Sequence, residues 1–324
     1  MENNIQRDPW YKTDEGFNAN EQLNYESIYT LGNGYLEQSG SFEENYSGET
    51  TVGAKLKVAD LKSSTEGVDS QFIEKHIAAP NLTRVVVRLN EEILDLALWD
   101  VQTFNRELNM KDGVLTRNFV VTSPKGHQIQ VVVKRFVSLD TKEIAAISYK
   151  VKSINFDGRI SFMPIIDGNI LNELDEPLWN VLQVKTDFEV ARILLQIRRK
   201  DTQLCAAMSY EFLKNNEPFK VIPAKIEKEK QVGYSVGCDV KKGESVMLNK
   251  YVAIVDSINY PKSQLSQLAG NIAQESKQQS WKHLFENHKT RWNMVWENWE
   301  SQQPKPVIDT SAKLYDYFNV FQNS

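Results

Sequence analysis

The feature that most constrains the fold is a long series of short apolar segments between residues 83 and 256, separated by turn residues. Segments 116–122 and 128–137 flank a Ser-Pro-Lys-Gly turn, with proline and glycine at positions that a β-turn favours. Segment 144–152 alternates apolar and polar side chains, which is typical of a half-buried strand. Strands at this spacing predict a mainly β fold, a large antiparallel β-sandwich. Further candidate strands lie at 83–90, 93–98, 191–198, 203–212, 219–227, 231–239 and 246–255.

The pattern changes after Pro261. Glycine and proline nearly vanish up to residue 300, and apolar side chains recur at helical spacing. A surface helix with several tryptophans must bury some of them against something large. Prolines 304 and 306 end this helix, and 307–324 predicts the start of another. The predicted interface residues are Trp281, Trp292, Trp296 and Trp299.

Charge and composition exclude several classes of partner. A net charge of −5 provides no overall basic field, so we expect no nucleic acid. No apolar run reaches the roughly 18 residues of a membrane-spanning helix, so we expect no membrane partner. The polar N-terminus shows no secretory signal, which favours a cytoplasmic location. Cys205 and Cys238 are too few for a disulfide framework and are expected to be buried thiols, and scattered histidines predict no metal site.

A glycine-rich stretch at 25–48 raises the question of a binding site. It lacks the GxxxxGK[ST] pattern and no GxGxxG opens a helix, so a nucleotide site is not predicted. Sugars stack on aromatic faces, but aromatic side chains near a turn can equally belong to the core. The adjacent pair Glu43-Glu44 and the acidic segment 167–177 are expected to be solvated loop acids rather than a catalytic pair. The candidate binding residues are Asn33, Gly34, Tyr35 and Phe42.

Several motifs together carry a family resemblance. The stretch 10–48, with its core LGNGYLEQSGSFEE, resembles the N-terminal signature of the glycoside hydrolase family 65 phosphorylases, which act on maltose, kojibiose and trehalose. The likeness continues in order through 79–81, 104–117, 134–138, 167–173, 207–211 and the helix of His288, Trp292 and Trp296. It covers essentially the whole chain.

The resemblance implies a domain order. It predicts a β-supersandwich at 1–258, a helical linker at 259–303 and, at 304–324, the start of an (α/α)6 barrel. In the family, that barrel carries the general acid and the phosphate site, and inorganic phosphate attacks the anomeric carbon with inversion. The eighteen residues 307–324 cannot form a twelve-helix barrel, so no catalytic residue of the family can be placed on this chain. Inorganic phosphate is then a co-substrate of the full-length enzyme, and no cofactor is expected.

Two positions depart from the family pattern. Glu37 stands where the family has glycine, and Ser39 stands where it has arginine. An arginine at this position can anchor a carboxylate or phosphate through two hydrogen bonds, which serine cannot do. These departures put the family's function in doubt for this chain.

Two functions follow as hypotheses. The first is an accessory, non-catalytic N-terminal domain of a protein that phosphorylyses or hydrolyses α-glucosides, partnered by a barrel domain and prone to form a homodimer through exposed tryptophans. The alternative is a stand-alone carbohydrate-binding or interaction module with α-glucosides as ligands.

Overall fold

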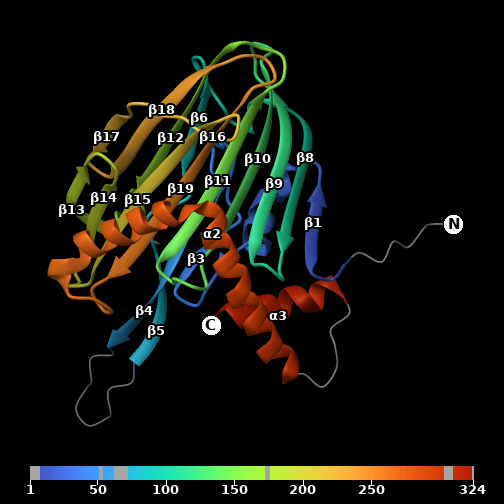
Figure 1. The fold of residues 1–324 in the computed structure, drawn as a ribbon. Coiled ribbons are helices and arrows are strands. Elements are labelled where there is room, and N and C mark those ends of the chain that lie inside the picture. Colours follow the sequence, from blue (N-terminus) through green and yellow to red (C-terminus); the bar gives the residue numbers. More distant parts are fainter. Residues whose placement is uncertain (1–7, 51–53, 62–71, 172–175, 303–308, 323–324) are drawn as a thin grey trace, which may run out of the picture.

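The computed structural model describes residues 8–50, 54–61, 72–171, 176–302 and 309–322. Its largest element is an antiparallel sheet of ten strands (Figure 1). In spatial order its strands are β1 (Tyr11–Glu15), β8 (Asp100–Asn109), β9 (Val114–Thr122), β10 (Gln128–Val137), β11 (Ile144–Ser153), β19 (Ser245–Asp256), β15 (Gln203–Lys214), β14 (Ala191–Ile197) and β13 (Trp179–Thr186), with β16 (Glu217–Pro218) beside β15.

Two smaller antiparallel sheets accompany it in the described part of the chain. The inner face of the large sheet packs on the five-stranded sheet through apolar side chains such as Val131 and Tyr149 on one side and Phe162 and Val236 on the other. The predicted mainly β fold is therefore confirmed. The five-stranded sheet comprises β17 (Ala224–Lys228), β18 (Gln231–Val240), β12 (Gly158–Asp167), β6 (Val85–Leu89) and β7 (Glu92–Ile93), and the four-stranded sheet comprises β2 (Leu31–Gly32), β3 (Leu36–Gln38), β4 (Ala54–Leu61) and β5 (Phe72–Ala78).

The helices lie mainly at the two ends of the chain. After the short η1 (Ala19–Glu21) and α1 (Gln22–Ile28), the next described helices are η2 (Lys262–Gln264), α2 (Leu265–Ser301) and α3 (Thr310–Gln322). The first half of α2 crosses the outer face of the large sheet over β11, β19, β15 and β14 (Figure 1). Small side chains on both sides, such as Ala269 and Ala273 against Cys205 and Ala253, allow this close approach. The helix kinks at Ser280, whose φ is 71°.

Both cysteines are free and buried, as predicted. Cys205 belongs to the cluster beneath α2, where burial raises the pKa of its thiol to about 12. Cys238 belongs to the core between the two large sheets. Neither thiol is available as a nucleophile at neutral pH, because a buried thiol with a raised pKa stays protonated.

A buried lysine connects the large sheet to the five-stranded sheet. Lys250 of β19 is completely buried, and burial holds the pKa of its ammonium well below the usual range. Its Nζ donates to the main-chain carbonyls of Leu82 (2.6 Å), Arg84 (3.0 Å) and Ile165 (2.8 Å). Three acceptors satisfy the three donors of one ammonium group. The lysine therefore fixes β19 against β12 and the segment that leads into β6.

Replacing this lysine tests the connection. Lys250→Met should lower the free energy of unfolding by about 2–4 kcal/mol, because three buried carbonyls lose their donor. Urea unfolding followed by tryptophan fluorescence measures the change. Lys152→Met is the matched control, since Lys152 is exposed on the neighbouring strand β11, and it should change stability by less than about 0.5 kcal/mol. Equal stability of the two variants would contradict the role of Lys250.

Candidate functional site at the glycine turn

The glycine turn connects β2 to β3, and its asparagine bonds to a distant loop. The Asn33 amide donates through Nδ2 to the carbonyls of Ser138 (2.6 Å) and Lys142 (2.9 Å). Its Oδ1 accepts from the main-chain N–H groups of Tyr35 (3.0 Å) and Leu36 (2.8 Å). Gly34 follows with a φ of +79°, a conformation that favours glycine. All four hydrogen-bonding positions of the amide are thus used within the protein.

Tyr35 is anchored in the same way. Its hydroxyl donates to Asp256 Oδ2 (2.7 Å) at the end of β19, and only 7% of the residue is exposed. Burial and the Asp256 carboxylate raise the pKa of the phenol far above its usual range. The Lys142 Nζ lies 5.1 Å from the centre of the Tyr35 ring, within cation–π range. The bonded hydroxyl and the covering lysine leave Tyr35 little free surface for a ligand.

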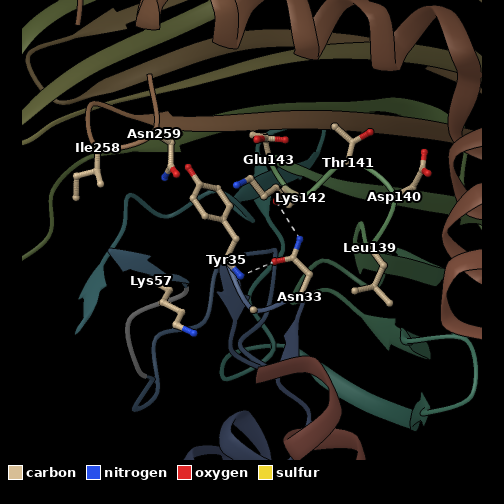
Figure 2. Close-up of a pocket in the computed structure, with 11 residues that line it drawn as sticks. Asn33, Tyr35, Lys57, Leu139, Asp140, Thr141, Lys142, Glu143, Ile258 and Asn259 are labelled. Atoms are coloured by element: carbon tan, nitrogen blue, oxygen red, sulfur yellow. Dashed lines mark hydrogen bonds between the residues drawn. The ribbon is translucent and has the colours of Figure 1, made fainter. Parts of the chain in front are cut away.

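An open pocket of about 590 Å³ lies beside the turn. Figure 2 shows the Asn33 amide directed at Lys142, and the Tyr35 ring pointing toward Asn259. Most of the polar groups that line this pocket already have protein partners. Asn259 donates to Asp256, and Glu143 accepts from Tyr260. The lining residues are Asn33, Gly34, Tyr35, Lys57, Leu139, Asp140, Thr141, Lys142, Glu143, Ile258 and Asn259.

Phe321 of α3 packs against Gly32, the first glycine of the turn. A Cβ added to Gly32 would lie 2.5 Å from ring carbons of Phe321, so only glycine leaves room for this contact. The same helix stacks Tyr317 on Trp292, with ring centres 5.3 Å apart. Lys313 places its Nζ 3.8 Å from the centre of the Trp10 ring. The segment that we predicted to begin a barrel therefore packs on the sandwich and on the glycine turn.

Phe42, the fourth candidate binding residue, lies in the core rather than beside the other three. It is 7% exposed and packs within the cluster between the two large sheets. The Arg117 guanidinium lies 4.7 Å from the centre of its ring, which leaves no ring face for a sugar. The structure thus brings together Asn33, Gly34 and Tyr35 and separates Phe42 from them.

The acidic pair after Phe42 is buried and fully engaged with arginines. Glu44 accepts from both terminal nitrogens of Arg117 at 2.7 Å, and Tyr149 donates to it at 3.0 Å. Glu43 pairs with Arg117 and lies 3.2 Å from Arg135. Burial alone would raise the pKa of Glu43, but these two guanidinium groups lower it below its usual value. The pair is not the solvated loop pair that we expected, because the sandwich encloses it.

A third arginine completes this interior group. Arg106 is the direct cross-strand partner of Arg117 and is 2% exposed. It donates to Gln22 Oε1 (2.8 Å), and burial lowers its pKa to about 10. Four aromatic rings surround its guanidinium with centres 5.0–5.3 Å away, those of Tyr25, Tyr29, Phe42 and Phe104.

Sequence reasoning missed these buried cations, although the strand pattern carried a signal. Arg117 shares its face of β9 with buried Leu115, Phe119 and Val121. Lys250 likewise falls between buried Leu248 and Val252 on β19. A cation at an inward position of an alternating strand predicts a buried partner.

Two of the four candidate interface tryptophans are covered by this chain itself. Trp292 is fully buried, stacked on Trp296 with ring centres 5.7 Å apart, and Gly113 makes room for it. Trp296 is 3% exposed and donates to the carbonyl of Met110 (3.1 Å). The hairpin between β8 and β9, together with α3, supplies the surface that we expected from another domain. Trp281 packs on Phe136, and partly buried Trp299 borders a groove of about 430 Å³.

The two positions that depart from the family pattern have ordinary structural roles. Glu37 lies in the extended strand β3, and its carboxylate is 3.4 Å from His76 Nε2. The main-chain carbonyl of Ser39 accepts from Arg135 (2.6 Å), and its hydroxyl donates to Ser41 (3.1 Å). Arg135 of β10 thus bonds to residue 39, the position at which the family pattern itself has an arginine.

The described residues contain no group of three or more His, Cys, Asp or Glu side chains that could hold a metal ion. Within the same ranges, no helix is both long and apolar enough to cross a membrane.

The fold is a set of antiparallel sheets followed by helices, the last of which packs on the LGNG turn. The chain matches the model of the glycosyl hydrolase family 65 N-terminal domain over residues 13–295. It therefore belongs to this family, and the predicted resemblance is confirmed.

The relatives are larger proteins. An α,α-trehalose phosphorylase from Thermoanaerobacter brockii is 25% identical over 307 residues, which are 89% of this chain and 39% of that protein. A maltose phosphorylase from Bacillus subtilis (strain 168) is 25% identical over 331 residues, 97% of this chain and 42% of that protein. The chain thus spans about two fifths of the length of these curated relatives.

A solved structure shows the same fold. A protein provisionally named kojibiose phosphorylase, from the human microbiome, superposes with a TM-score of 0.77 at 19% sequence identity. The match covers 89% of this chain and 38% of that one.

The contact between the glycine turn and α3 can be tested by a double-mutant cycle. Gly32→Ala should cost about 1–3 kcal/mol of unfolding free energy, because its Cβ overlaps the Phe321 ring. In a Phe321→Ala background the same change should cost less than about 0.5 kcal/mol. Urea unfolding of the four proteins gives the coupling energy, and additive effects would contradict the contact.

Buried His288 predicts acid sensitivity. Its Nδ1 accepts from the N–H of Leu139 (3.1 Å), and burial lowers its pKa to about 3. The unfolded chain binds a proton near pH 6.5, so stability falls as pH drops from about 6.5 toward 3. Between pH 7 and pH 4.5 this histidine should cost about 2–3 kcal/mol of unfolding free energy.

The measurement compares variants at the two pH values. His288→Gln should lose about 2–3 kcal/mol less than the parent protein between pH 7 and pH 4.5, whatever its stability at pH 7. His283→Gln, an exposed position on the same helix, should keep the parent's pH dependence. Identical pH profiles for His288→Gln and the parent would refute the assignment.

Proposed function

We propose that this chain is the non-catalytic N-terminal scaffold domain of an α-glucoside phosphorylase-like or hydrolase-like protein of carbohydrate metabolism, acting in the cytoplasm. The observation that carries the proposal is the enclosure of Glu43 and Glu44, with side chains 1% and 0% exposed, by Arg117 and Arg135. A general acid needs a raised pKa and access to substrate, but arginines lower the pKa of Glu43. The pair is suited to holding the sandwich together.

The relatives support the same role. Two named phosphorylases align with this chain over about two fifths of their own length. A scaffold of this kind would act with an (α/α)6 barrel as its partner, and inorganic phosphate would be a co-substrate of the complete enzyme. Trp292 and Trp296 are buried, so a homodimer of the kind predicted from exposed tryptophans would form through Trp281 and Trp299, which are only partly buried.

The alternative, a stand-alone carbohydrate-binding or interaction module, is less well supported at the residues first chosen for it. Asn33 and Tyr35 have their polar groups bonded within the protein, and Phe42 is buried under Arg117. A sugar at the glycine turn would have to break these bonds before it could replace them.

The test is a direct assay of the purified chain. With inorganic phosphate and maltose, kojibiose or trehalose, it should release no glucose 1-phosphate, and without phosphate it should release no glucose. The Bacillus subtilis maltose phosphorylase serves as the positive control with maltose. Phosphate-dependent release of glucose 1-phosphate by the purified chain would overturn the non-catalytic assignment.

A further inference from the structure

Exposed apolar side chains gather around the segment that joins β16 to β17 (Figure 1). Ile222 of this segment is 97% exposed, and Phe188, in the loop between β13 and β14, is 82% exposed. Together with Phe219, which is 41% exposed, they line an open groove of about 630 Å³. Single exposed apolar residues are ordinary, but a cluster of them rimmed by polar groups marks an interaction surface.

The main chain of the same segment is also available for pairing. Residues 219–223 run between two strands but belong to neither. The N–H of Phe219 donates to the carbonyl of Phe212 (2.9 Å), whereas the N–H groups of residues 220–222 meet no protein acceptor in the described structure. The strand that follows, β17, is the outermost strand of the five-stranded sheet. Unpaired main-chain groups at a sheet edge can pair with a strand of another molecule.

The charge pattern of the segment limits how it can pair with a second copy of itself. When two copies pair antiparallel about a two-fold axis, residues equally far from the central residue face each other. A pair centred on Lys220 would set two ammonium groups against each other, and a pair centred on Ile222 would set Glu217 against Glu227. Like charges that face each other destabilise a strand pair.

The register centred on Val221 brings opposite charges together instead. It sets Glu217 of each copy opposite Lys225 of the other, so two carboxylate–ammonium pairs flank the axis. Both side chains are exposed. Glu217 has no ion pair in the part of the chain that the structure describes, and Lys225 donates to the neutral carbonyl of Thr186 (3.0 Å). The segment is therefore complementary to itself in this register.

We infer that the 219–223 segment is an interface for a second copy of this chain, with two segments paired antiparallel about an axis at Val221. The pairing supplies acceptors for the free N–H groups and covers the exposed apolar side chains of the groove. It lies apart from Trp281 and Trp299, so the two routes to a homodimer can be distinguished. It does not depend on the scaffold role proposed above.

Sedimentation velocity of the whole chain at several concentrations tests the interface, and the parent should form a dimer. Ile222→Lys should weaken it about tenfold or more, because position 222 faces Lys220 of the other copy. Ile222→Glu should keep or strengthen the dimer, since a carboxylate then faces that ammonium group. Leu98→Lys is the matched control, a 69% exposed residue in the turn before β8, and it should dimerise like the parent.

The inference is wrong if the parent chain stays monomeric at about 0.5 mM. It is also wrong if both Ile222 variants weaken the dimer equally, because a non-specific apolar contact would respond in that way. A dimer that survives Ile222→Lys but is lost in Trp299→Ala would place the interface at the tryptophans. Glu217→Lys is a second variant that should weaken the dimer, and urea unfolding of each variant separates lost association from lost folding.

Discussion

The constraint on which the rest of the structure depends is the compensation of positive charge inside the sandwich. Arg106, Arg117, Arg135 and Lys250 are each 2% exposed or less. Removing a cation from water costs several kcal/mol unless carboxylates, carbonyls or aromatic rings replace its hydration. Arg106 and Arg117 even face each other across neighbouring strands, where like charges repel. The segment that carries Glu43 and Glu44 must therefore enter the core at this position.

The position of the glycine turn depends on the entry of the Glu43–Glu44 segment into the core. The residues between the turn and the acidic pair are held by Arg135, which bonds the carbonyl of Ser39. The glycine turn contacts three other parts of the chain. Asn33 bonds to the 138–142 loop, Tyr35 bonds to β19, and Gly32 packs against α3. A motif that resembles a ligand loop is thus the joint between the sandwich and the C-terminal helix. Its glycines allow close packing and a positive φ rather than phosphate binding.

The polar groups at the glycine turn are satisfied inside the protein. Asn33 bonds to the carbonyls of Ser138 and Lys142, and Tyr35 bonds to Asp256. Buried polar groups are bonded in this way because an unpaired one costs free energy.

The sequence by itself determined the mainly β fold, the long helix with its tryptophans and the membership of family 65, because alternation, turn residues and motif order are local properties. It also contained the inward cations Arg117 and Lys250, visible as breaks in strand alternation. Only the tertiary structure decided that Phe42 is core, that Glu43 and Glu44 pair with Arg117, and that Trp292 is covered by α3 and the β8–β9 hairpin. These outcomes depend on partners 70 or more residues away, except for the nearby α3, and no local pattern specifies which distant segment will pack against a given face.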